Sequence, residues 1–319
     1  MAEQSTRQID LVLTTPPPLT LHPAAVYLSS LTAGSRRTMQ KALNVIARLL
    51  TKGECDALSL DWSKLSYQYT AAIRAILMEQ YSPATANRML CALRRVLKEA
   101  LRLGSMSAED YTRAVDLKRI KGDSPLRGRL LKTEEIARLL HDCYLDQNKI
   151  GIRDAALIAI LSGSGVRRSE AVALDKKDFH REDNSLKVRK GKGGKYRTVY
   201  LPPGAVAVLD DWLKIRGKSP GALICPVRRG GHIHIRQMTD QAVMAIAQKR
   251  AVSAGIERFS PHDFRRTFIT RLLESGVDVL TVCELVGHES PATTQKYDLR
   301  SETAKRQAVQ FLNVLYDQN

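Results

Sequence analysis

Residues 185–201 read SLKVRKGKGGKYRTVYL, and this stretch decides the fold class. The segments 185–190 and 196–201 have strand character, and the Gly-rich turn 191–195 lies between them. Two such segments joined by a Gly-rich turn predict an antiparallel β-hairpin. Outward from the hairpin, apolar residues recur at helical spacing along most of the chain. The predicted fold class is therefore mainly α with a small antiparallel β-sheet.

The first part of the chain is predicted to be an all-helical domain over residues 21–117. Residues 1–20 are expected to form a flexible lead, because the three consecutive prolines at 16–18 cannot be helical. Ser35 and Ser82 are plausible N-cap residues of two helices. The helices expected in this domain are Pro23–Leu31, Ser35–Leu50, Trp62–Gln80, Ser82–Gly104 and Ala108–Asp116.

A basic segment with glycine and proline over residues 118–130 predicts a linker, and a second domain is expected over residues 131–319. Helical spacing dominates this domain outside the hairpin. Its expected helices are Thr133–Cys143, Ile152–Leu161, Ala205–Ile215, Gln237–Ala254, Pro261–Ser275, Val279–Val286, Pro291–Tyr297 and Glu302–Leu315.

The chain carries 50 Lys and Arg against 33 Asp and Glu, which gives a formal net charge of +17. A surplus of this size indicates a polyanionic partner, and nucleic acid is the first candidate. The alternative is a basic protein that is merely soluble. The surplus lies in both halves of the chain, so both domains could contact DNA as a two-domain clamp would.

Several basic residues of the first domain and the linker are candidates for DNA contacts. Arg88, Arg94, Arg95 and Lys98 are polar positions of the fourth predicted helix, and Lys121 lies in the linker. Basic side chains of this kind can set a protein on the phosphates of a duplex. The alternative interpretation is an ordinary solvated helix face.

Metal, disulfide and membrane signals are weak. The five cysteines are widely spaced and include no Cys-x-x-Cys pair, which argues against a disulfide framework and a zinc site. His232 and His234 lack a third ligand, so they support a metal site poorly. No apolar run has the length of a membrane span or the pattern of a signal peptide. We expect a cytoplasmic protein that needs no metal or other cofactor.

Six residues of the second domain supply the groups that phosphodiester cleavage needs: a nucleophile, cations and an acid for the leaving oxygen. They are Arg167, Lys192, His262, Arg265, His288 and Tyr297. Each has an ordinary alternative when taken alone, since a His-x-x-Arg pair is usually a surface feature and a tyrosine is more often a packed phenol. The segment around Lys192 lacks the full phosphate-loop pattern and precedes a strand, which argues against a nucleotide site.

In their order and spacing, four segments around these residues resemble the motifs of the tyrosine recombinases. The segments are Gly165–Glu170, Gly191–Arg197, Ser260–Thr267, and Leu285–His288 with Thr293–Tyr297. The Xer and phage-integrase branches are the most similar, and the resemblance covers about residues 130–300. The helical domain resembles the family's core-binding domain by position and class only. Arg266 departs from the pattern, because many relatives carry histidine there, and Val166 replaces a more usual leucine.

The resemblance implies a mechanism without ATP, metal or cofactor. Tyr297 would attack the scissile phosphate, form a 3′-phosphotyrosyl bond and release a 5′-hydroxyl. Arg167 and Arg265 would clamp the non-bridging oxygens, because the guanidinium fork matches phosphate geometry. Lys192 would protonate the leaving oxygen. Of the two histidines, His262 would assist proton transfer, and the other would hydrogen-bond the phosphate.

The resemblance also implies double-stranded DNA with specific recombination sites as the substrate. Family members recombine two sites within a homotetramer, through a Holliday junction. The last expected helix would dock on a neighbouring protomer or pack on its own domain. An accessory protein or a partner recombinase could take part. The role stays open among integration or excision of an element, dimer resolution and cointegrate resolution.

Two rival functions remain. A type IB topoisomerase has related chemistry but would act alone and relax supercoils, and the small helical domain and the closing motif argue against it. A DNA-binding regulator could keep the fold without catalysis, but all six candidate positions are filled.

Overall fold

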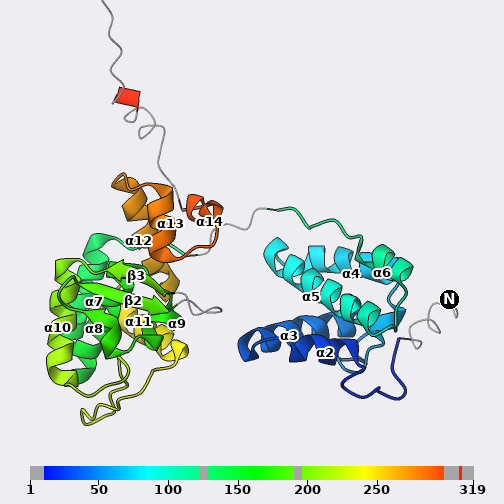
Figure 1. Cartoon of the computed structure of the whole chain (residues 1–319), viewed down its shortest axis with the longest axis horizontal. Helices are drawn as coiled ribbons and strands as arrows, with labels where there is room; N and C mark the ends of the chain where they lie inside the picture. The colour runs from blue at the N-terminus through cyan, green and yellow to red at the C-terminus, as the bar shows by residue number, and fades with distance from the viewer. Residues whose placement is uncertain (1–10, 123–127, 190–195, 298–308, 311–319) are drawn as a thin grey trace, which may run out of the picture. The chain divides into compact units, whose positions relative to one another are not determined.

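The computed structural model describes residues 11–122, 128–189, 196–297 and 309–310. The chain forms two compact units, Met1–Arg127 and Gly128–Asn319 (Figure 1). Each unit has an apolar core of its own. The predicted fold class is confirmed, because helices dominate both units and the second unit holds a three-stranded antiparallel sheet.

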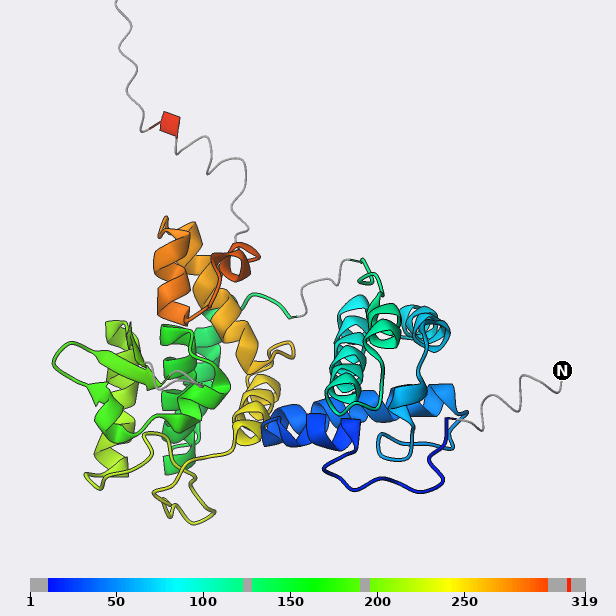
Figure 2. The ribbon, with the colours of Figure 1, turned by 45° about the vertical axis from the view of Figure 1, so that its right-hand side comes forward.

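The first unit is a helical bundle built around α5. Its elements are α2 (Pro23–Ser29), α3 (Ala33–Leu50), the short 3₁₀ helix η1 (Trp62–Lys64), α4 (Tyr67–Gln80), α5 (Pro83–Arg102) and α6 (Ala108–Val115). The α5 residues Leu90, Leu93 and Leu97 recur at helical spacing and are fully buried. Helices α2, α3, α4 and α6 pack against α5 (Figure 2).

Two features of this unit differ from the sequence-based expectation. Thr32 rather than Ser35 occupies the N-cap position of α3, because the extended backbone at Thr32 turns directly into the helix. The segment expected as one helix over 62–80 is broken after η1. Leu65 is extended and buried there, and the buried Trp62 indole donates a hydrogen bond to a backbone carbonyl oxygen. Burial of these two side chains overrides local helical spacing.

The lead and the linker are shorter than expected. The flexible lead predicted over residues 1–20 does not hold for Leu11, which is 1% exposed in the core of the first unit. The linker predicted over 118–130 is divided between the units. Ile120 is buried in the first core, while Arg129 pairs with a glutamate of the second unit. Apolar burial and ion pairing thus draw both ends of the linker into the folded units.

The second unit contains α7 (Thr133–Leu145), α8 (Lys149–Ser164), α9 (Arg168–Ala173), η2 (Lys176–Asp178), β1 (Phe179–His180), β2 (Ser185–Arg189), β3 (Tyr196–Tyr200), α10 (Pro203–Arg216), α11 (Asp240–Ser253), α12 (Pro261–Glu274), α13 (Val279–Val286) and α14 (Pro291–Gln295). The predicted hairpin is confirmed, with Leu186 opposite Val199. β1 and α9 were not predicted, because elements this short show no periodicity. The expected helix Glu302–Leu315 lies outside the described residues except for 309–310.

Helix α8 is the central helix of the second unit. It is apolar around its circumference, as a helix buried on all sides should be, and α7, α10 and α12 pack against it. It ends at Gly165, whose φ of +60° favours glycine. A Cβ atom on Gly165 would lie 2.4 Å from the Phe268 ring. Because Gly165 has no side chain, α12 can pack closely against the C-terminal end of α8. The chain then continues directly to Arg167.

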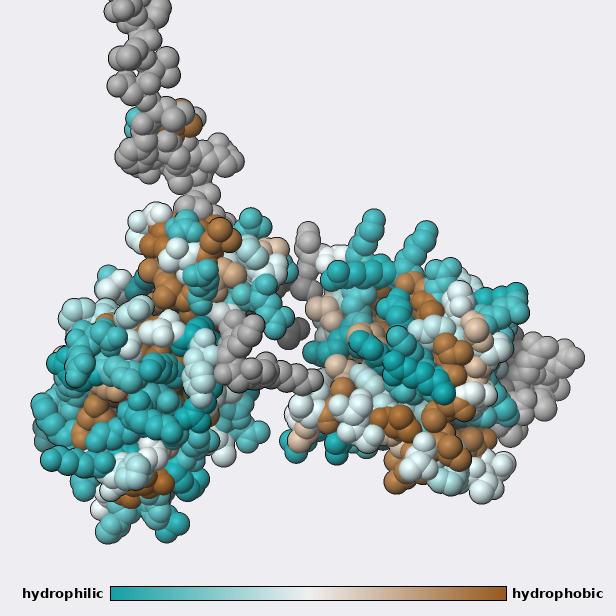
Figure 3. Space-filling model, in the orientation of Figure 1, coloured by the Kyte–Doolittle hydropathy of each residue, from teal (hydrophilic) through white to brown (hydrophobic). Residues whose placement is uncertain are grey.

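The visible surface of the second unit is mostly hydrophilic, with apolar side chains gathered around α13 (Figure 3). Leu280 of α13 is an exposed member of this region. Among the residues that the structure describes, no helix is both long and apolar enough to cross a membrane.

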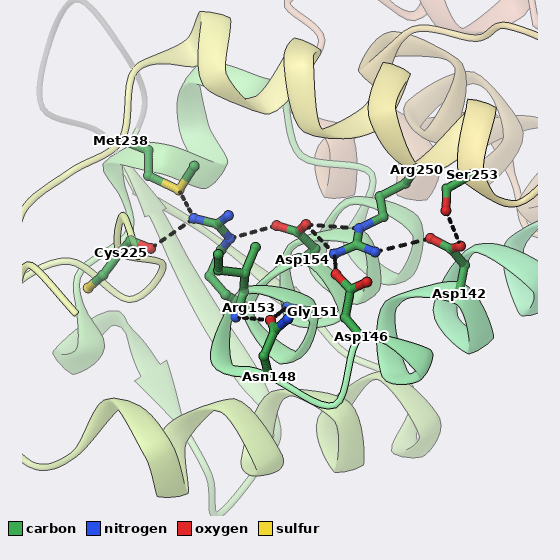
Figure 4. A network of polar contacts seen from close by, with 11 residues as sticks. Asp142, Asp146, Asn148, Gly151, Arg153, Asp154, Cys225, Met238, Arg250 and Ser253 are labelled. Carbon is green, nitrogen blue, oxygen red and sulfur yellow. Dashed lines mark hydrogen bonds and ion pairs between the residues drawn. The ribbon is translucent and has the colours of Figure 1, made fainter. Parts of the chain in front are cut away.

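A buried network of charged side chains joins α7, α8 and α11 (Figure 4). Arg250 of α11 is 1% exposed and donates hydrogen bonds to Asp154 at 2.9 Å and Asp142 at 3.1 Å. It also donates to Asp146 at 2.6 Å, and Arg153 donates to Asp154 at 2.7 Å. Because an unpaired buried charge is costly, the packing of the three helices is mutually dependent.

Replacing Arg250 by Met should destabilise the second unit, because Asp154 would lose one of its two cations, and Asp142 its cation, while both carboxylates remain buried. We expect the free energy of unfolding to fall by about 3–5 kcal/mol. Trp212 is the tryptophan of the second unit and Trp62 that of the first, so urea unfolding followed by fluorescence in a Trp62→Phe background reports on the second unit. Lys249→Met, on the exposed side of α11, is the matched control. Equal stability of the two variants would contradict the expectation.

Candidate active site

Helix α12 carries two of the candidate residues. Pro261 occupies its first turn, and Ser260 and Asp263 form a capping box. The cap fixes where the helix begins and therefore where His262 lies. Arg265 follows three residues later, so both side chains lie on neighbouring positions of one face.

Tyr297 lies against this face of α12. Its Oη atom is 3.2 Å from Nε2 of His262, within hydrogen-bond distance. Its backbone carbonyl oxygen accepts a hydrogen bond of 3.3 Å from Thr270 of α12. The rings of Tyr297 and His288 are stacked, with centroids 6.2 Å apart and an interplanar angle of 19°. The phenol is half-buried, and its hydroxyl lies beside the other candidate groups.

Arg265 is the most deeply buried residue of the site, at 1% exposure. Its guanidinium donates to the carbonyl oxygen of Gly165 at 2.8 Å and to that of Val286 at 2.7 Å. It therefore joins the C-terminal ends of α8 and α13. Burial, and then the neighbouring Arg167, lower the pKa of Arg265 to about 10, so the group remains cationic at neutral pH.

Arg167 brings a second guanidinium to the same place. It is the N-cap residue of α9 and donates to Glu170 at 2.8 Å and to the carbonyl oxygen of Gly287 at 3.2 Å. Arg265 bonds the preceding carbonyl, that of Val286. The two guanidinium groups thus meet adjacent carbonyls at the end of α13, while Arg167 remains exposed.

Both histidines are neutral at pH 7. Burial, followed by Arg265 and Arg167, lowers the pKa of His288 to about 4. Burial, followed by Arg265 and Arg266, lowers the pKa of His262. The Nδ1 atom of His288 lies 2.8 Å from the Thr294 hydroxyl, which orients the ring. The cations of the site therefore hold both rings in the form that can accept a proton.

A pocket of about 300 Å³ opens beside these groups. The residues that line it are Val166, Arg167, Arg168, Ser169, Met244, Ser260, Pro261, His262 and Arg265. Three of the six candidates, Arg167, His262 and Arg265, therefore line one open space. Tyr297 contacts His262 and stacks on His288 beside them. The sixth, Lys192, lies outside the described residues, as does the tip of the hairpin that carries it.

Sequence reasoning missed the ion pair between Glu170 and Arg197. Arg197 of β3 donates two hydrogen bonds to the carboxylate, at 3.0 and 2.7 Å, and a third to the carbonyl oxygen of Leu285 at 2.9 Å. Burial alone would raise the pKa of Glu170, but the hydrogen bonds from Arg197 and Arg167 lower it to about 2. The carboxylate therefore orients Arg167 and connects it to the sheet. Both residues lie in the quoted motifs, but no spacing rule indicates that they pair.

Gly287 allows the Arg197 side chain to approach the end of α13. Its φ is +67°, and it ends α13 directly before His288. A Cβ atom there would lie 3.0 Å from the Arg197 guanidinium. Glycine is therefore required both by the backbone conformation and by the close approach of that side chain.

The candidate DNA-contact residues of the first unit do not form one set. Arg88, Arg95 and Lys121 are exposed and Lys98 is half-exposed. Arg94 departs from the predicted face, because it is half-buried and donates to the carbonyl oxygen of Leu117 at 2.6 Å. This bond ties α5 to the chain that follows α6, so Arg94 supports the bundle.

Within residues 11–122, 128–189 and 196–297, no three His, Cys, Asp or Glu side chains lie close enough together to hold an ion. His232 and His234 therefore remain without a third ligand among these residues.

Known proteins share both the sequence and the fold. The pattern of the phage integrase family matches residues 129–303. The tyrosine recombinase XerD of Mycobacterium leprae (strain TN) is 35% identical over 243 residues, covering 71% of this chain and 72% of that protein. XerC of Pelobacter propionicus is 34% identical over 221 residues, covering 68% and 69%.

Two solved structures show the same architecture. XerH bound to a palindromic difH substrate, in a post-cleavage complex, superposes with a TM-score of 0.64 at 22% identity, covering 95% of this chain and 92% of that chain. A lambda integrase dimer bound to a COC′ core site superposes with a TM-score of 0.61 at 14% identity, covering 93% and 80%. At such identities the likeness concerns the fold alone.

The match to the family and to the Xer relatives, together with the fold, defines a tyrosine recombinase, an enzyme that cuts and rejoins DNA at specific sites. The chain belongs to the phage integrase family, and it is of the Xer type.

Replacing Glu170 by Gln should destabilise the second unit in a pH-dependent way. The ionised carboxylate contributes stability that is fully present above an unfolded-state pKa of about 4.5 and is lost as the pH falls towards about 2. We expect the variant to be less stable than the wild type by about 2–3 kcal/mol at neutral pH. Thermal unfolding at a series of pH values tests this, with Glu274→Gln on the exposed side of α12 as control. If the difference in stability between the wild type and the variant does not become smaller below about pH 4.5, the ionised Glu170 carboxylate is not its cause.

Proposed function

We propose that Tyr297 is the nucleophile that cleaves one DNA strand at the recombination site. Its Oη atom attacks phosphorus, the bond to the 5′ oxygen breaks, and a 3′-phosphotyrosyl link remains. The observation that carries this proposal is the position of the hydroxyl, 3.2 Å from His262, a residue that lines the same pocket as Arg167 and Arg265. The phosphotyrosyl bond retains the energy of the broken bond, so rejoining needs no ATP.

Arg167 and Arg265 are proposed to bind the non-bridging oxygens of that phosphate. Their planar forks match phosphate geometry, and both remain anchored to backbone carbonyls. Charge that develops on the phosphorane-like transition state would then meet two fixed cations. Loss of either guanidinium should lower the cleavage rate by a factor of about 10² or more.

The histidines and Lys192 are proposed to handle protons and the phosphate. A neutral His262 can accept the phenolic proton at its present distance. His288 would donate a hydrogen bond to a phosphate oxygen through Nε2, since its Nδ1 faces Thr294. Lys192, at the hairpin tip, is expected to protonate the leaving 5′ oxygen. That last role depends on the family resemblance.

Replacing Tyr297 by Phe should abolish covalent DNA attachment, because only the nucleophilic oxygen is lost. The measurement uses a library of nicked duplexes with a randomised site. After cleavage the short released fragment diffuses away, so rejoining is prevented and the covalent adduct accumulates. Denaturing gels detect the adduct, and sequencing the captured strands identifies the site. Tyr144→Phe, which removes a hydroxyl bonded to Asp211 on the surface, is the matched control and should form the adduct normally. Adduct formation by Tyr297→Phe would refute the proposal.

The helical first unit, over about residues 21–117, is proposed to bind DNA through α5, joined by a basic linker to a catalytic domain over about 131–319. Arg88 and Arg95 are seven residues apart and exposed, and Lys98 follows on the same side of the helix. Such a row can follow the phosphates of a duplex. Lys121 would add a contact from the start of the linker.

The double variant Arg88→Gln, Arg95→Gln should weaken DNA binding chiefly through lost counterion release. The slope of log affinity against log salt should become shallower by about 0.9 for each lost phosphate contact. Fluorescence anisotropy with the selected duplex at several salt concentrations measures it. Arg113→Gln, an exposed residue of α6 that pairs with Glu109, is the control. An unchanged slope in the double variant would exclude this face.

The assembly and biological setting are proposed from the family. Four protomers would hold two DNA sites and exchange strands in pairs through a Holliday junction, in the cytoplasm, with or without an accessory protein or partner recombinase. Element integration or excision, dimer resolution and cointegrate resolution all fit this chemistry.

A further inference from the structure

We propose that Arg266 is a positioning residue for Tyr297, holding the phenol ring with its guanidinium during cleavage. The inference rests on the proposed role of Tyr297 as nucleophile. It concerns a residue outside the six candidates, at a position where this chain departs from the family pattern. A cation in place of a neutral imidazole changes the charge directly beside the nucleophile.

The geometry places two successive turns of α12 against the two ends of one side chain. His262 and Arg266 are four residues apart, so they lie on the same face of the helix. His262 Nε2 lies 3.2 Å from the Tyr297 hydroxyl, and Arg266 Cζ lies 5.5 Å from the centroid of the Tyr297 ring. The second distance is within the range of cation–π contacts. One helix face therefore fixes both the hydroxyl and the ring.

Arg266 is well placed to act through its charge. It is 8% exposed, so water screens its field on the ring only weakly. Its Nε atom lies 3.9 Å from Oδ1 of Asp263, which is longer than a hydrogen bond. That carboxylate accepts hydrogen bonds from the backbone N–H groups of Arg129 and Ser260. Asp263 is thus shared with the cap of α12.

The charged and titratable groups that act on this part of the site include four guanidinium groups and two carboxylates. They are His262, Asp263, Arg265 and Arg266 of α12, Arg167 at the start of α9, Glu170 of α9, Arg197 of β3, and His288 after α13. After burial and Arg265, Arg266 is the next cause that lowers the pKa of His262. Without Arg266, His262 would bind a proton at higher pH. This change moves the acidic limb of the cleavage profile to higher pH.

Single-turnover cleavage of the selected nicked duplex, at saturating protein and across about pH 6 to 9, tests the inference. Arg266→Met keeps an unbranched apolar stem and removes the guanidinium with its charge. We expect it to cleave about tenfold more slowly at neutral pH. Its acidic limb should move upward by about half a pH unit or more, while DNA affinity stays unchanged. Arg266→Lys retains the charge and should recover most of the shift in the limb.

Three variants, Arg271→Met, Arg266→Lys and Tyr297→Phe, serve as controls that distinguish the possible outcomes. Arg271→Met removes another guanidinium of α12, one that donates to the Leu131 carbonyl oxygen, and should keep the wild-type pH profile. A wild-type rate and limb in Arg266→Met, with adducts still formed by Tyr297, would overturn this inference alone. An equal rate loss at every pH, not recovered by Arg266→Lys, would also overturn it. Adducts formed by Tyr297→Phe would instead overturn the proposed nucleophile.

Discussion

The buried guanidinium of Arg265, bonded to the carbonyl oxygens of Gly165 and Val286, is the interaction on which the site depends. Helices α8 and α13 both end at glycines with left-handed backbone, and Arg265 binds the carbonyl just before or at each turn. Arg167 follows one turn and His288 the other. Arg265, which is proposed to bind phosphate, therefore also sets the spacing between Arg167 and His288. Its guanidinium is buried for this reason.

The cations gathered around the pocket act electrostatically on the two histidines and on one another. Burial, and after it the field of the guanidinium groups, lowers the pKa of both histidines, so that their rings are neutral. The guanidinium groups also repel one another. The Glu170 carboxylate accepts hydrogen bonds from Arg197 and Arg167. It thus offsets part of this repulsion and fixes the direction of Arg167.

Periodicity and turn chemistry predicted the long elements well. α5 and α13 begin and end near the expected residues, and the Gly-rich turn indicated the β2–β3 hairpin correctly. Failures occurred where burial of individual side chains overrides local preference, as at Trp62 and Leu65, or where an element is too short to show a period, as in α9. Arg94 was assigned to an exposed face because its position is polar, although its guanidinium satisfies a backbone carbonyl of the same bundle.

The sequence by itself determined the fold class and the family resemblance, and it predicted the candidate site residues, because these depend on residue type, order and local spacing. Only the tertiary structure decided which charged side chains contact one another or an aromatic ring. The pairing of Glu170 with Arg197, the buried position of Arg265 and the stacking of Arg266 on Tyr297 join residues of different elements or different turns. Such contacts are chosen by how helices and strands pack, since burial makes an unpaired charge costly, and no pattern along the chain records that choice.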